Sequence, residues 1–260
     1  MKNPTLSLQD KCAIVTGAST GIGAAIATAY AQAGARVVIN FEPGTEAPDE
    51  MLATIKAEGG EAIAVAADIS DVSQHALLLD AALNTYERLD IVVNNAAVLG
   101  GGQFFGISEE TWDRTQSINL KAPYFLIQAA AKIMTERNIK GRVINVTSTH
   151  AFRPNKLYTA YSISKAGLEM LTQSLALELA EFGITVNSIV PGSVNTAMSG
   201  FHHTPERRKQ AADKVPLGRG GMPEDLVGAA LFLASNGAEY ITGANIKVNG
   251  GFGLGVGQKL

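Results

Sequence analysis

The chain has few of the features that mark membrane, secreted or nucleic-acid-binding proteins. It has one cysteine, Cys12, so no internal disulfide can form, which agrees with a reducing compartment. No apolar run approaches the ~20 residues that span a membrane, and the first residues lack the apolar stretch of a signal peptide. With 17% charged residues and a net charge of −3, it lacks the basic excess of a dedicated nucleic-acid surface. We therefore expect a cytoplasmic protein that acts on a small molecule and binds neither membranes nor nucleic acids.

Two short motifs invite a functional interpretation that their surroundings do not support. The neighbouring His202 and His203 lack a nearby acidic or cysteine partner, so we expect no metal site. The tripeptide 145–147 matches a glycosylation acceptor, but it lies in an apolar run that indicates a buried strand. We expect neither motif to be functional.

Short apolar runs alternate with longer helical patterns along all 260 residues. The predicted strands are Cys12–Thr16, Arg36–Asn40, Ala62–Ala66, Asp90–Asn94, Arg142–Thr147, Thr185–Ile189 and Asn245–Val248. The predicted helices are Gly21–Ala33, Asp49–Glu58, Val72–Tyr86, Glu109–Arg137, Tyr158–Phe182 and Pro223–Ala234. Continuous apolar strands between helices indicate a parallel sheet covered on both faces. The sequence therefore predicts an α/β fold: one domain, residues 1–260, with a doubly wound seven-stranded sheet.

The stretch 193–221 interrupts this β/α alternation after the sixth strand. It contains Gly200, Pro205 and the charged run Glu206-Arg-Arg-Lys209. In an open α/β sheet, ligands bind beyond the carboxyl ends of the strands, so an insertion there would cover the binding crevice. We expect a substrate lid; the alternative is an ordinary pair of surface helices with a polar face.

A glycine-rich loop joins the first predicted strand to the first predicted helix. It reads Thr16-Gly-Ala-Ser-Thr-Gly-Ile-Gly23, with glycines at positions 17, 21 and 23. Such a loop makes a tight turn, brings the backbone close to a pyrophosphate and directs a helix N-terminus at the anion. Glycine-rich turns are common, but this position between strand and helix favours a dinucleotide site.

Tyr161 and Lys165 are four residues apart, so on a helix their side chains share one face. A tyrosine has an ordinary pKa of about 10, and a nearby ammonium lowers it. Proton exchange near neutral pH needs a lowering of roughly three units, more than one lysine at a partly exposed site supplies. A second positive charge, such as an oxidised nicotinamide ring, would help. Alone, such a pair is more often a solvated helix face.

Taken together, these motifs resemble those of the short-chain dehydrogenase/reductase family, Rossmann-fold oxidoreductases that use nicotinamide coenzymes. The resemblance runs from about Asp10 to Phe252. It rests on Thr16-Gly-x-x-x-Gly-Ile-Gly23, Asp68, Asn94-Asn-Ala-Ala97, Asn119, Ser148, Tyr161-x-x-x-Lys165 and Pro191-Gly192. One departure is Ala97-Val98, where the family usually has Ala-Gly; this position shapes a turn and does no chemistry.

The resemblance assigns catalytic roles to Asn119, Ser148, Tyr161 and Lys165. It makes Tyr161 the general acid and base, while Lys165 lowers its pKa and binds the nicotinamide ribose. Ser148 would hold the reacting oxygen of the substrate, and Asn119 a helix kink and a water that leads to solvent. Taken singly, Ser148 is equally typical of a cap and Asn119 of a buried amide.

The resemblance also implies a set of coenzyme contacts. Asp68 would bond the adenine, with Ile69 beside the ring, and Asn95 and Ala96 would line the adenosine ribose. Val194 and Thr196 would contact the carboxamide or the diphosphate. The full coenzyme-binding set is Gly17, Ser19, Thr20, Gly21, Ile22, Gly23, Asn40, Phe41, Asp68, Ile69, Asn95, Ala96, Tyr161, Lys165, Pro191, Gly192, Val194 and Thr196.

The end of the second strand bears on the choice between NAD and NADP. A carboxylate there binds the ribose 2′-hydroxyl, and a basic residue accepts a 2′-phosphate. Asn40-Phe41 resembles relatives that tolerate NADP, but Glu42 and Thr20 stand where NADP enzymes often have arginine. With no cation in this stretch, a 2′-phosphate would meet only Glu42. We expect NAD, with dual use possible.

The substrate is indicated by resemblance to a subfamily alone. The stretch 139–150 is similar to bacterial glucose 1-dehydrogenases and related sugar dehydrogenases. We expect Ser148, His150 and Tyr161 to face a sugar or polyol, although His150 could equally be a surface or interface histidine. The alternatives are a 3-oxoacyl-carrier-protein reductase or other ketone reductase, for which Arg207, Arg208 and Lys209 could dock an acidic carrier, and a non-catalytic cofactor-sensing protein.

The resemblance also implies a homotetramer, since relatives commonly pair the helices that correspond to Glu109–Arg137 and Tyr158–Phe182. The apolar tail Phe252–Leu260 would either pack against a neighbouring subunit or remain loose.

Overall fold

Seven parallel strands form one sheet, in the order β3-β2-β1-β4-β5-β6-β7. The computed structural model describes residues 6–199 and 204–254. The strands are β1 (Cys12–Val15), β2 (Arg36–Phe41), β3 (Glu61–Ala66), β4 (Ile91–Asn94), β5 (Arg142–Val146), β6 (Thr185–Pro191) and β7 (Asn245–Val248). The order reverses between β1 and β4, which is the switch point of a doubly wound sheet. The predicted fold is confirmed, and strand limits differ from the prediction by one or two residues.

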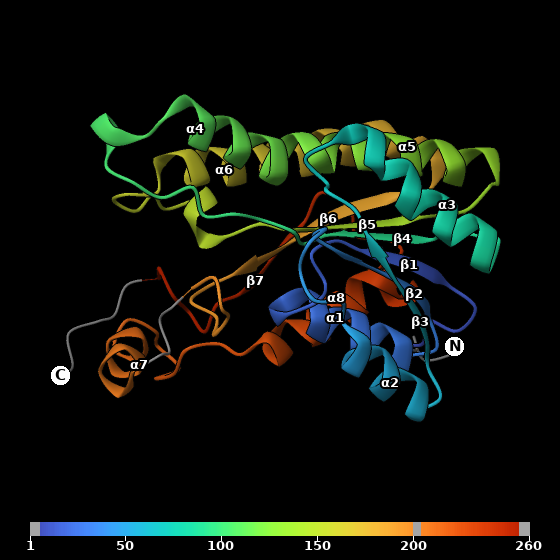
Figure 1. Ribbon diagram of the computed structural model, residues 1–260, viewed down its shortest axis with the longest axis horizontal. Helices are drawn as coiled ribbons and strands as arrows, with labels where there is room; N and C mark the ends of the chain where they lie inside the picture. The colour runs from blue at the N-terminus through green and yellow to red at the C-terminus, as the bar shows by residue number, and fades with distance from the viewer. Residues whose placement is uncertain (1–5, 200–203, 255–260) are drawn as a thin grey trace.

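Helices cover the sheet in two layers, one on each face (Figure 1). The first layer contains α1 (Gly21–Gln32), α2 (Asp49–Ala57) and α8 (Val227–Ala234). The second contains α3 (His75–Tyr86), α4 (Glu109–Gln116), α5 (Ala122–Glu136) and α6 (Thr159–Leu179). Within the described ranges, no helix combines the length and the apolar character needed to cross a membrane.

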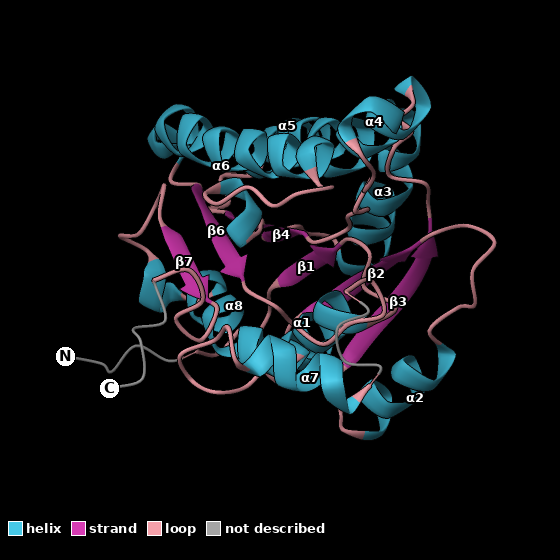
Figure 2. Ribbon diagram, turned by 90° about the vertical axis from the view of Figure 1, so that its left-hand side faces the viewer, coloured by secondary structure: helices cyan, strands magenta, loops and turns pink. Residues whose placement is uncertain are grey.

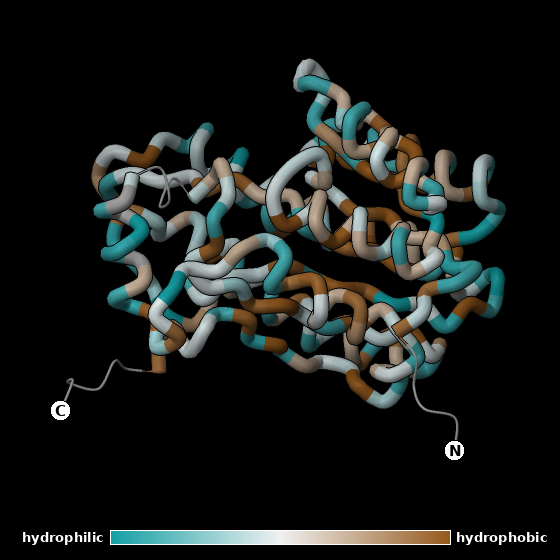
Figure 3. Tube along the Cα trace, turned by 90° about the horizontal axis from the view of Figure 1, so that it is seen from below, coloured by the Kyte–Doolittle hydropathy of each residue, from teal (hydrophilic) through white to brown (hydrophobic). Residues whose placement is uncertain are grey.

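Successive side chains along each strand point to opposite faces of the sheet and pack into two separate hydrophobic cores. In β1, Val15 packs toward α1 and α8, whereas Ile14 packs toward α3 and α5. In β2, Ile39 and Val38 divide in the same way. Because both faces are covered, nearly every strand position is apolar, which is the pattern seen in the sequence. Hydrophobic stretches accordingly run through the middle of the chain trace, and hydrophilic ones lie mostly at its periphery (Figure 3).

The helix predicted over 109–137 is interrupted. Between α4 and α5, residues Ser117–Lys121 form a π-helical turn. Buried Asn119 lies in this turn, and its side chain bonds both the N–H and the C=O of Val98, each at 2.9 Å. Sharp bends in helices are often found at such π turns.

The insertion at 193–221 leaves and rejoins the fold at one point. Val194 and Gly221 form an isolated parallel bridge, with Asn195 N–H donating to Gly221 O and Gly221 N–H donating to Ser193 O, both at 2.8 Å. The insertion contains α7 (Pro205–Ala212), a helix that the sequence analysis did not assign. In Figure 1, α7 lies at the lower left, beyond the ends of α1 and α8, on the side that faces the viewer in Figure 2. His202, His203 and most of the tail (255–260) lie outside the described residues.

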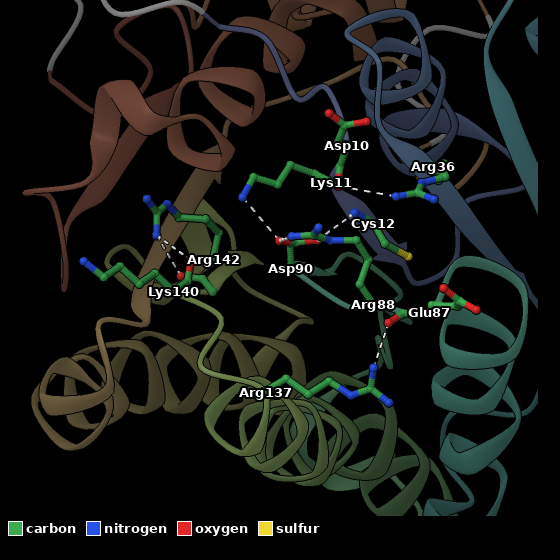
Figure 4. A network of polar contacts seen from close by, with 11 residues as sticks. Asp10, Lys11, Cys12, Arg36, Glu87, Arg88, Asp90, Arg137, Lys140 and Arg142 are labelled. Atoms are coloured by element: carbon green, nitrogen blue, oxygen red, sulfur yellow. Dashed lines mark hydrogen bonds and ion pairs between the residues drawn. The ribbon is translucent and has the colours of Figure 1, made fainter.

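The amino ends of the central strands are joined by the buried carboxylate of Asp90 (Figure 4). It accepts two hydrogen bonds from the Arg88 guanidinium, both at 2.7 Å, and one from the Cys12 N–H at 2.9 Å. Lys11 adds an ion pair at 3.3 Å. Burial raises the pKa of Asp90, but these donors outweigh burial and hold the pKa below its ordinary value. Charged Asp90 therefore fastens β4 to β1 at the edge opposite the cleft described below.

Replacing Asp90 by Asn should lower the free energy of unfolding by about 2 kcal/mol at pH 7, because Asn cannot accept all of these bonds and leaves Arg88 without its counter-charge. Since the native pKa is depressed, the contribution of Asp90 is complete above about pH 4 and is lost as the pH falls through the native value. Urea titrations should therefore show the difference between the variant and the parent shrinking below that pH. Asp80→Asn, at an exposed position, should change stability by less than about 0.5 kcal/mol. Equal stability of parent and Asp90→Asn at pH 7 would contradict this account.

Candidate functional site

A cleft of about 1010 Å³ lies at the carboxyl ends of the strands. It is lined by residues that the sequence analysis drew from separate parts of the chain. Those predicted residues are Gly17, Ser19, Thr20, Gly21, Ile22, Asn40, Asp68, Ile69, Asn95, Ala96, Ser148, His150, Tyr161, Lys165, Pro191, Gly192, Val194 and Thr196. Gly23, Phe41 and Asn119 do not line the cleft.

The glycine loop forms one wall of the cleft and cannot carry side chains at key positions. Gly17 and Gly21 have φ values of 57° and 60°, a region that L side chains rarely adopt. A Cβ on Gly17 would lie 2.8 Å from the Cα of Ala96, and one on Gly23 would lie 2.5 Å from the Asn95 amide nitrogen. The loop therefore packs directly on the segment after β4, leaving its backbone exposed to the cleft. The first turn of α1 carries no acidic side chain, so an anion at this helix end meets no repulsion there.

Two polar side chains lock the loop in place. The Thr16 hydroxyl accepts bonds from the N–H groups of Asn95 (3.0 Å) and Ala96 (3.1 Å). The Asn95 amide donates to the carbonyls of Thr16 and Gly17, both at 2.9 Å. The segment after β4 and the glycine loop thus form one rigid unit.

Asn40 has a structural task that the sequence analysis did not anticipate. Its side chain is buried; it accepts from Gly17 N–H at 3.1 Å and donates to Ala67 O at 2.9 Å. The amide is consequently committed to holding the loop between β2 and β3. Asn40 lines the cleft, but its side chain is not free to bind a ribose.

Ser148, Tyr161 and Lys165 meet at the opposite end of the cleft. Ser148 follows β5, and Tyr161 and Lys165 lie on the buried face of α6. Lys165 Nζ lies 5.8 Å from the centre of the Tyr161 ring and donates to Val146 O at 2.8 Å. One of its three N–H groups is therefore committed to the protein, and the others remain for a ligand.

The electrostatics of this group differ from the expectation for a tyrosine beside a lysine. Burial raises the pKa of Tyr161, and the hydrogen bond from Ser148 only partly opposes that rise. Burial also lowers the pKa of Lys165 to about 8, against the attraction of Glu169. Burial thus outweighs the Ser148 bond and holds the pKa of Tyr161 above its ordinary value, and a positive charge bound in the cleft would lower it.

His150 lies beside the tyrosine with part of its hydrogen-bonding capacity unused. Its ring packs edge-on against Tyr161, with the ring centres 5.5 Å apart, and lies tilted against Tyr158 at 5.6 Å. Burial lowers its pKa, so the imidazole is neutral at pH 7. Its Nδ1 is buried and has no partner among the described residues, and the same holds for Ser193 Oγ across the cleft. Both atoms can bond a polar ligand in the cleft.

Asn119 lies behind this group. Its amide nitrogen donates to Val98 O and to Ser164 Oγ at 3.0 Å, and Ser164 in turn donates to Tyr161 O. The amide thus supports the start of α6 from the π turn. Within the described residues, no cluster of His, Cys, Asp or Glu side chains could hold a metal ion.

Acidic side chains line the far end of the cleft, and a basic residue outside the cleft lining pairs with one of them. Glu42, Glu46, Asp49, Glu50 and Asp68 all line this end. Arg114, on α4, reaches across to Glu42 with a distance of 3.2 Å between Nη2 and Oε1. The sequence analysis found no cation near Glu42, and the structure places the guanidinium of Arg114 beside that carboxylate.

The residues that sequence reasoning missed come from distant segments. Arg114 is 72 positions from Glu42, so no local pattern could pair them. Tyr158 and Asn155 belong to the connection before α6, and Lys214 comes from the insertion; all three line the cleft. The one available signal was position, since each lies in or beside a segment that follows a strand.

Comparison with known proteins identifies similar chains. Residues 17–253 match a family model described as enoyl-(acyl carrier protein) reductase. The chain is 39% identical to glucose 1-dehydrogenase 2 of Bacillus subtilis, covering 95% of this chain and 96% of that protein. It is 41% identical to L-rhamnose 1-dehydrogenase (NAD(P)(+)) of Azotobacter vinelandii, covering 94% and 97%. A solved Agrobacterium tumefaciens structure with bound NADP, a candidate 2-deoxy-D-gluconate 3-dehydrogenase, has a TM-score of 0.87 at 38% identity, covering 96% and 99%.

Gly23→Ala should weaken dinucleotide binding, because its methyl group would displace Asn95 and the loop that Asn95 holds. We expect the dissociation constant for NAD, measured by calorimetry, to rise about tenfold, a change of roughly 1.4 kcal/mol. Gly228→Ala is the matched control: it lies in α8, has an ordinary φ, and its methyl group would meet open space. That control should bind NAD normally. Unchanged binding by Gly23→Ala would disprove the steric argument.

Proposed function

This chain belongs to the short-chain dehydrogenase/reductase family, and from that premise we propose that it interconverts a hydroxyl and a carbonyl group of a sugar or polyol. As a member it is a nicotinamide-dependent oxidoreductase that acts on CH–OH groups. The observation that carries the proposal is the convergence of Ser148, Tyr161 and Lys165 beside the unpartnered Nδ1 of His150. Tyr161 is proposed as the general acid and base.

A nicotinamide coenzyme fits the protein groups that face the cleft. The glycine loop offers bare backbone at Gly17 and Gly21 for a pyrophosphate, since a Cβ on Gly21 would meet Thr196 at 3.3 Å. Asp68 and Ile69 line the adenosine end, and the remaining N–H groups of Lys165 suit ribose hydroxyls. When bound, the coenzyme supplies or accepts the hydride.

The protein residues supply the proton chemistry. In alcohol oxidation, Tyr161 takes the proton of the substrate hydroxyl at its phenol oxygen, and in carbonyl reduction it returns that proton. Ser148 donates a hydrogen bond to the same substrate oxygen. The ammonium of Lys165 favours the phenolate form of Tyr161, which burial alone disfavours. Asn119 holds the π turn, and its proposed water leads the proton toward solvent.

The polar lining around the tyrosine supports a substrate rich in hydroxyl groups. Thr149, His150, Asn155, Tyr158 and Ser193 all line this part of the cleft. A pocket with several hydrogen-bonding groups selects ligands that satisfy them, because unpaired buried polar groups are costly. The insertion 193–221 is proposed as the lid over this substrate, and its residues Met198 and Lys214 reach the cleft.

A carrier-protein reductase is the second candidate, because the matching family model carries an enoyl-(acyl carrier protein) reductase description. Such an enzyme needs a basic surface for its acidic carrier, and α7 offers Arg208 and Lys209 near the cleft. The acidic far end of the cleft supports the sugar candidate instead, since carrier-protein reductases of this family generally prefer NADPH. A non-catalytic sensor is the third candidate.

We propose that NAD is the preferred coenzyme and that NADP is also accepted. The five carboxylates at the adenosine end repel a 2′-phosphate, whereas Arg114 offers it one charge partner. Both members of the Glu42–Arg114 pair are more than half exposed, so the pair is weak and can exchange partners. Use of both coenzymes matches the name of the relative L-rhamnose 1-dehydrogenase (NAD(P)(+)).

A homotetramer in the cytoplasm is proposed on the resemblance and on one surface. Between α5 and α6 lies a groove of about 470 Å³, rimmed by the exposed apolar side chains of Tyr124 and Met170. Leu177, further along α6, is also exposed. Paired helices of a second copy would cover these groups, and light scattering measures the resulting mass.

Assays with a panel of sugars, polyols, sugar acids and acetoacetyl thioesters test the proposed function. We expect turnover on at least one sugar or polyol and none on the thioester. Tyr161→Phe should lower kcat by about 10²- to 10⁴-fold, because it removes the acid/base group, and should retain NAD binding. Thioester activity without sugar activity would favour the second candidate. Unchanged turnover in Tyr161→Phe would rule out the proposed mechanism.

Glu42→Gln should raise the ratio of kcat/KM for NADP to that for NAD by about tenfold, since it removes the nearest repulsive charge and frees Arg114. Arg114→Gln should lower the same ratio. Glu136→Gln, which removes the carboxylate of an exposed ion pair on α5, is the control and should leave the ratio unchanged. A parent enzyme that strongly prefers NADP, with Glu42→Gln showing no change, would contradict the NAD proposal.

A further inference from the structure

Glu169 is a buried carboxylate for which the proposed reaction has no use. It lies on α6 and is only 4% exposed. Ser188 donates to both of its oxygens, at 3.0 and 2.9 Å, and Thr147 and Asn245 each donate one further hydrogen bond. Thr147 directly follows β5, Ser188 lies in β6 and Asn245 lies in β7. Glu169 therefore ties three adjacent strands to one point on the helix.

Glu169 lies one helical turn after Lys165, on the same buried face. A buried carboxylate is costly unless it is hydrogen-bonded and faces an opposite charge, and the same holds for a buried ammonium. Lys165 is fully buried, and its ammonium donates to an uncharged carbonyl, that of Val146. Burial raises the pKa of Glu169 and lowers that of Lys165, and the attraction between the two charges opposes both shifts.

The other charged groups around α6 point away from Glu169 and Lys165. Lys247, two residues past Asn245 on β7, directs its ammonium to the ring of Phe152 at 5.6 Å. His150 on η4 (Thr149–Ala151) lies against Tyr158 and Tyr161, and Arg142 is at the far end of β5. β6 carries no titratable side chain. The charged side chains of α4, α5 and the π turn are exposed: Glu109, Glu110, Asp113, Arg114, Lys121, Lys132 and Glu136.

We propose that Glu169 is a positioning residue that acts through Lys165 and Ser148. Its carboxylate supplies the compensating charge beneath the Lys165 ammonium. Through Thr147 it fixes the end of β5, where Ser148 follows directly. The inference rests on the proposed acid/base role of Tyr161, because the charge of Lys165 matters only if it acts on that phenol.

Removing the charge of Glu169 should raise the pKa of Tyr161, and the distances along the helix decide this direction. Burial lowers the pKa of Lys165 to about 8, and the charge of Glu169 opposes that fall. Without Glu169, a smaller fraction of Lys165 is protonated at pH 8. The Tyr161 phenolate then loses the stabilisation that the nearby ammonium provides. Loss of the carboxylate also removes a direct repulsion on the phenolate. That repulsion acts over about 12 Å of helix, against about 6 Å for Lys165, so the loss of lysine charge dominates.

The first experiment is the pH profile of kcat for alcohol oxidation in Glu169→Gln, which keeps the shape and removes the charge. The acidic limb should move to higher pH by about one unit, with the KM for substrate nearly unchanged. Thr172→Val is the matched control, since Thr172 is equally buried on α6 but bonds Asn145 and Leu168 instead. Thr172→Val should lower the thermal stability of the protein but should not shift the acidic limb of the pH profile. A limb that stays fixed, or moves to lower pH, in Glu169→Gln would overturn the proposal.

The second experiment needs no turnover. In Lys165→Met the Glu169 carboxylate is left buried without its counter-charge. Adding Glu169→Gln should therefore raise the thermal midpoint of Lys165→Met, whereas the same change should lower the midpoint of the parent. A lower midpoint in both backgrounds would show that Glu169 is merely structural and would overturn the inference. A protein inactive on every sugar would defeat the proposed function and leave this result standing, so the two failures are distinguishable.

Discussion

The site depends on burying one face of α6 against β5 and β6. That burial places Tyr161 and Lys165 in a water-poor environment, where both shift toward their neutral forms. A buried phenol is a poor base, and a buried lysine holds its proton less firmly. The same environment strengthens every charge that enters it, because the effective dielectric constant is low. The protein alone therefore presents a group that becomes competent only when further charge is supplied.

The other half of the cleft is formed by the glycine loop. There the shape of the backbone, and not charge, determines how a ligand is bound. The side chains of Thr16, Asn40 and Asn95 form hydrogen bonds within or to the glycine loop. These bonds hold the loop from both β2 and β4. A rigid loop loses little conformational freedom when it meets a ligand. Charge enters only at the far end, through the carboxylates around Glu42 and the opposing Arg114. We therefore expect the glycine loop to determine the affinity for the coenzyme, and the charged groups around Glu42 to determine the choice between NAD and NADP.

The sequence predicted the sheet, its strand count and most helix limits, because an apolar strand covered on both faces has a distinctive composition. It also predicted which segments reach the cleft, since the carboxyl ends of parallel strands share one edge. It did not predict the shift of the Tyr161 pKa, because burial depends on packing between distant elements. For the same reason it missed Arg114 beside Glu42 and the hydrogen bonds by which Asn40 holds the glycine loop. α7 escaped assignment because its short polar sequence carries no apolar periodicity.

The bridge between Val194 and Gly221 has a consequence for how such a protein can diversify. Because the chain departs from and returns to the sheet at one paired position, the residues between these points form a modular unit. The entropy of closing a loop grows only slowly with its length, so this unit can lengthen, shorten or change composition at small cost. The strands and the tyrosine would be undisturbed by such exchange, whereas Thr196, which lies against Gly21, would have to be kept. New substrate ranges can then arise by replacing one cassette, while the catalytic apparatus is inherited intact.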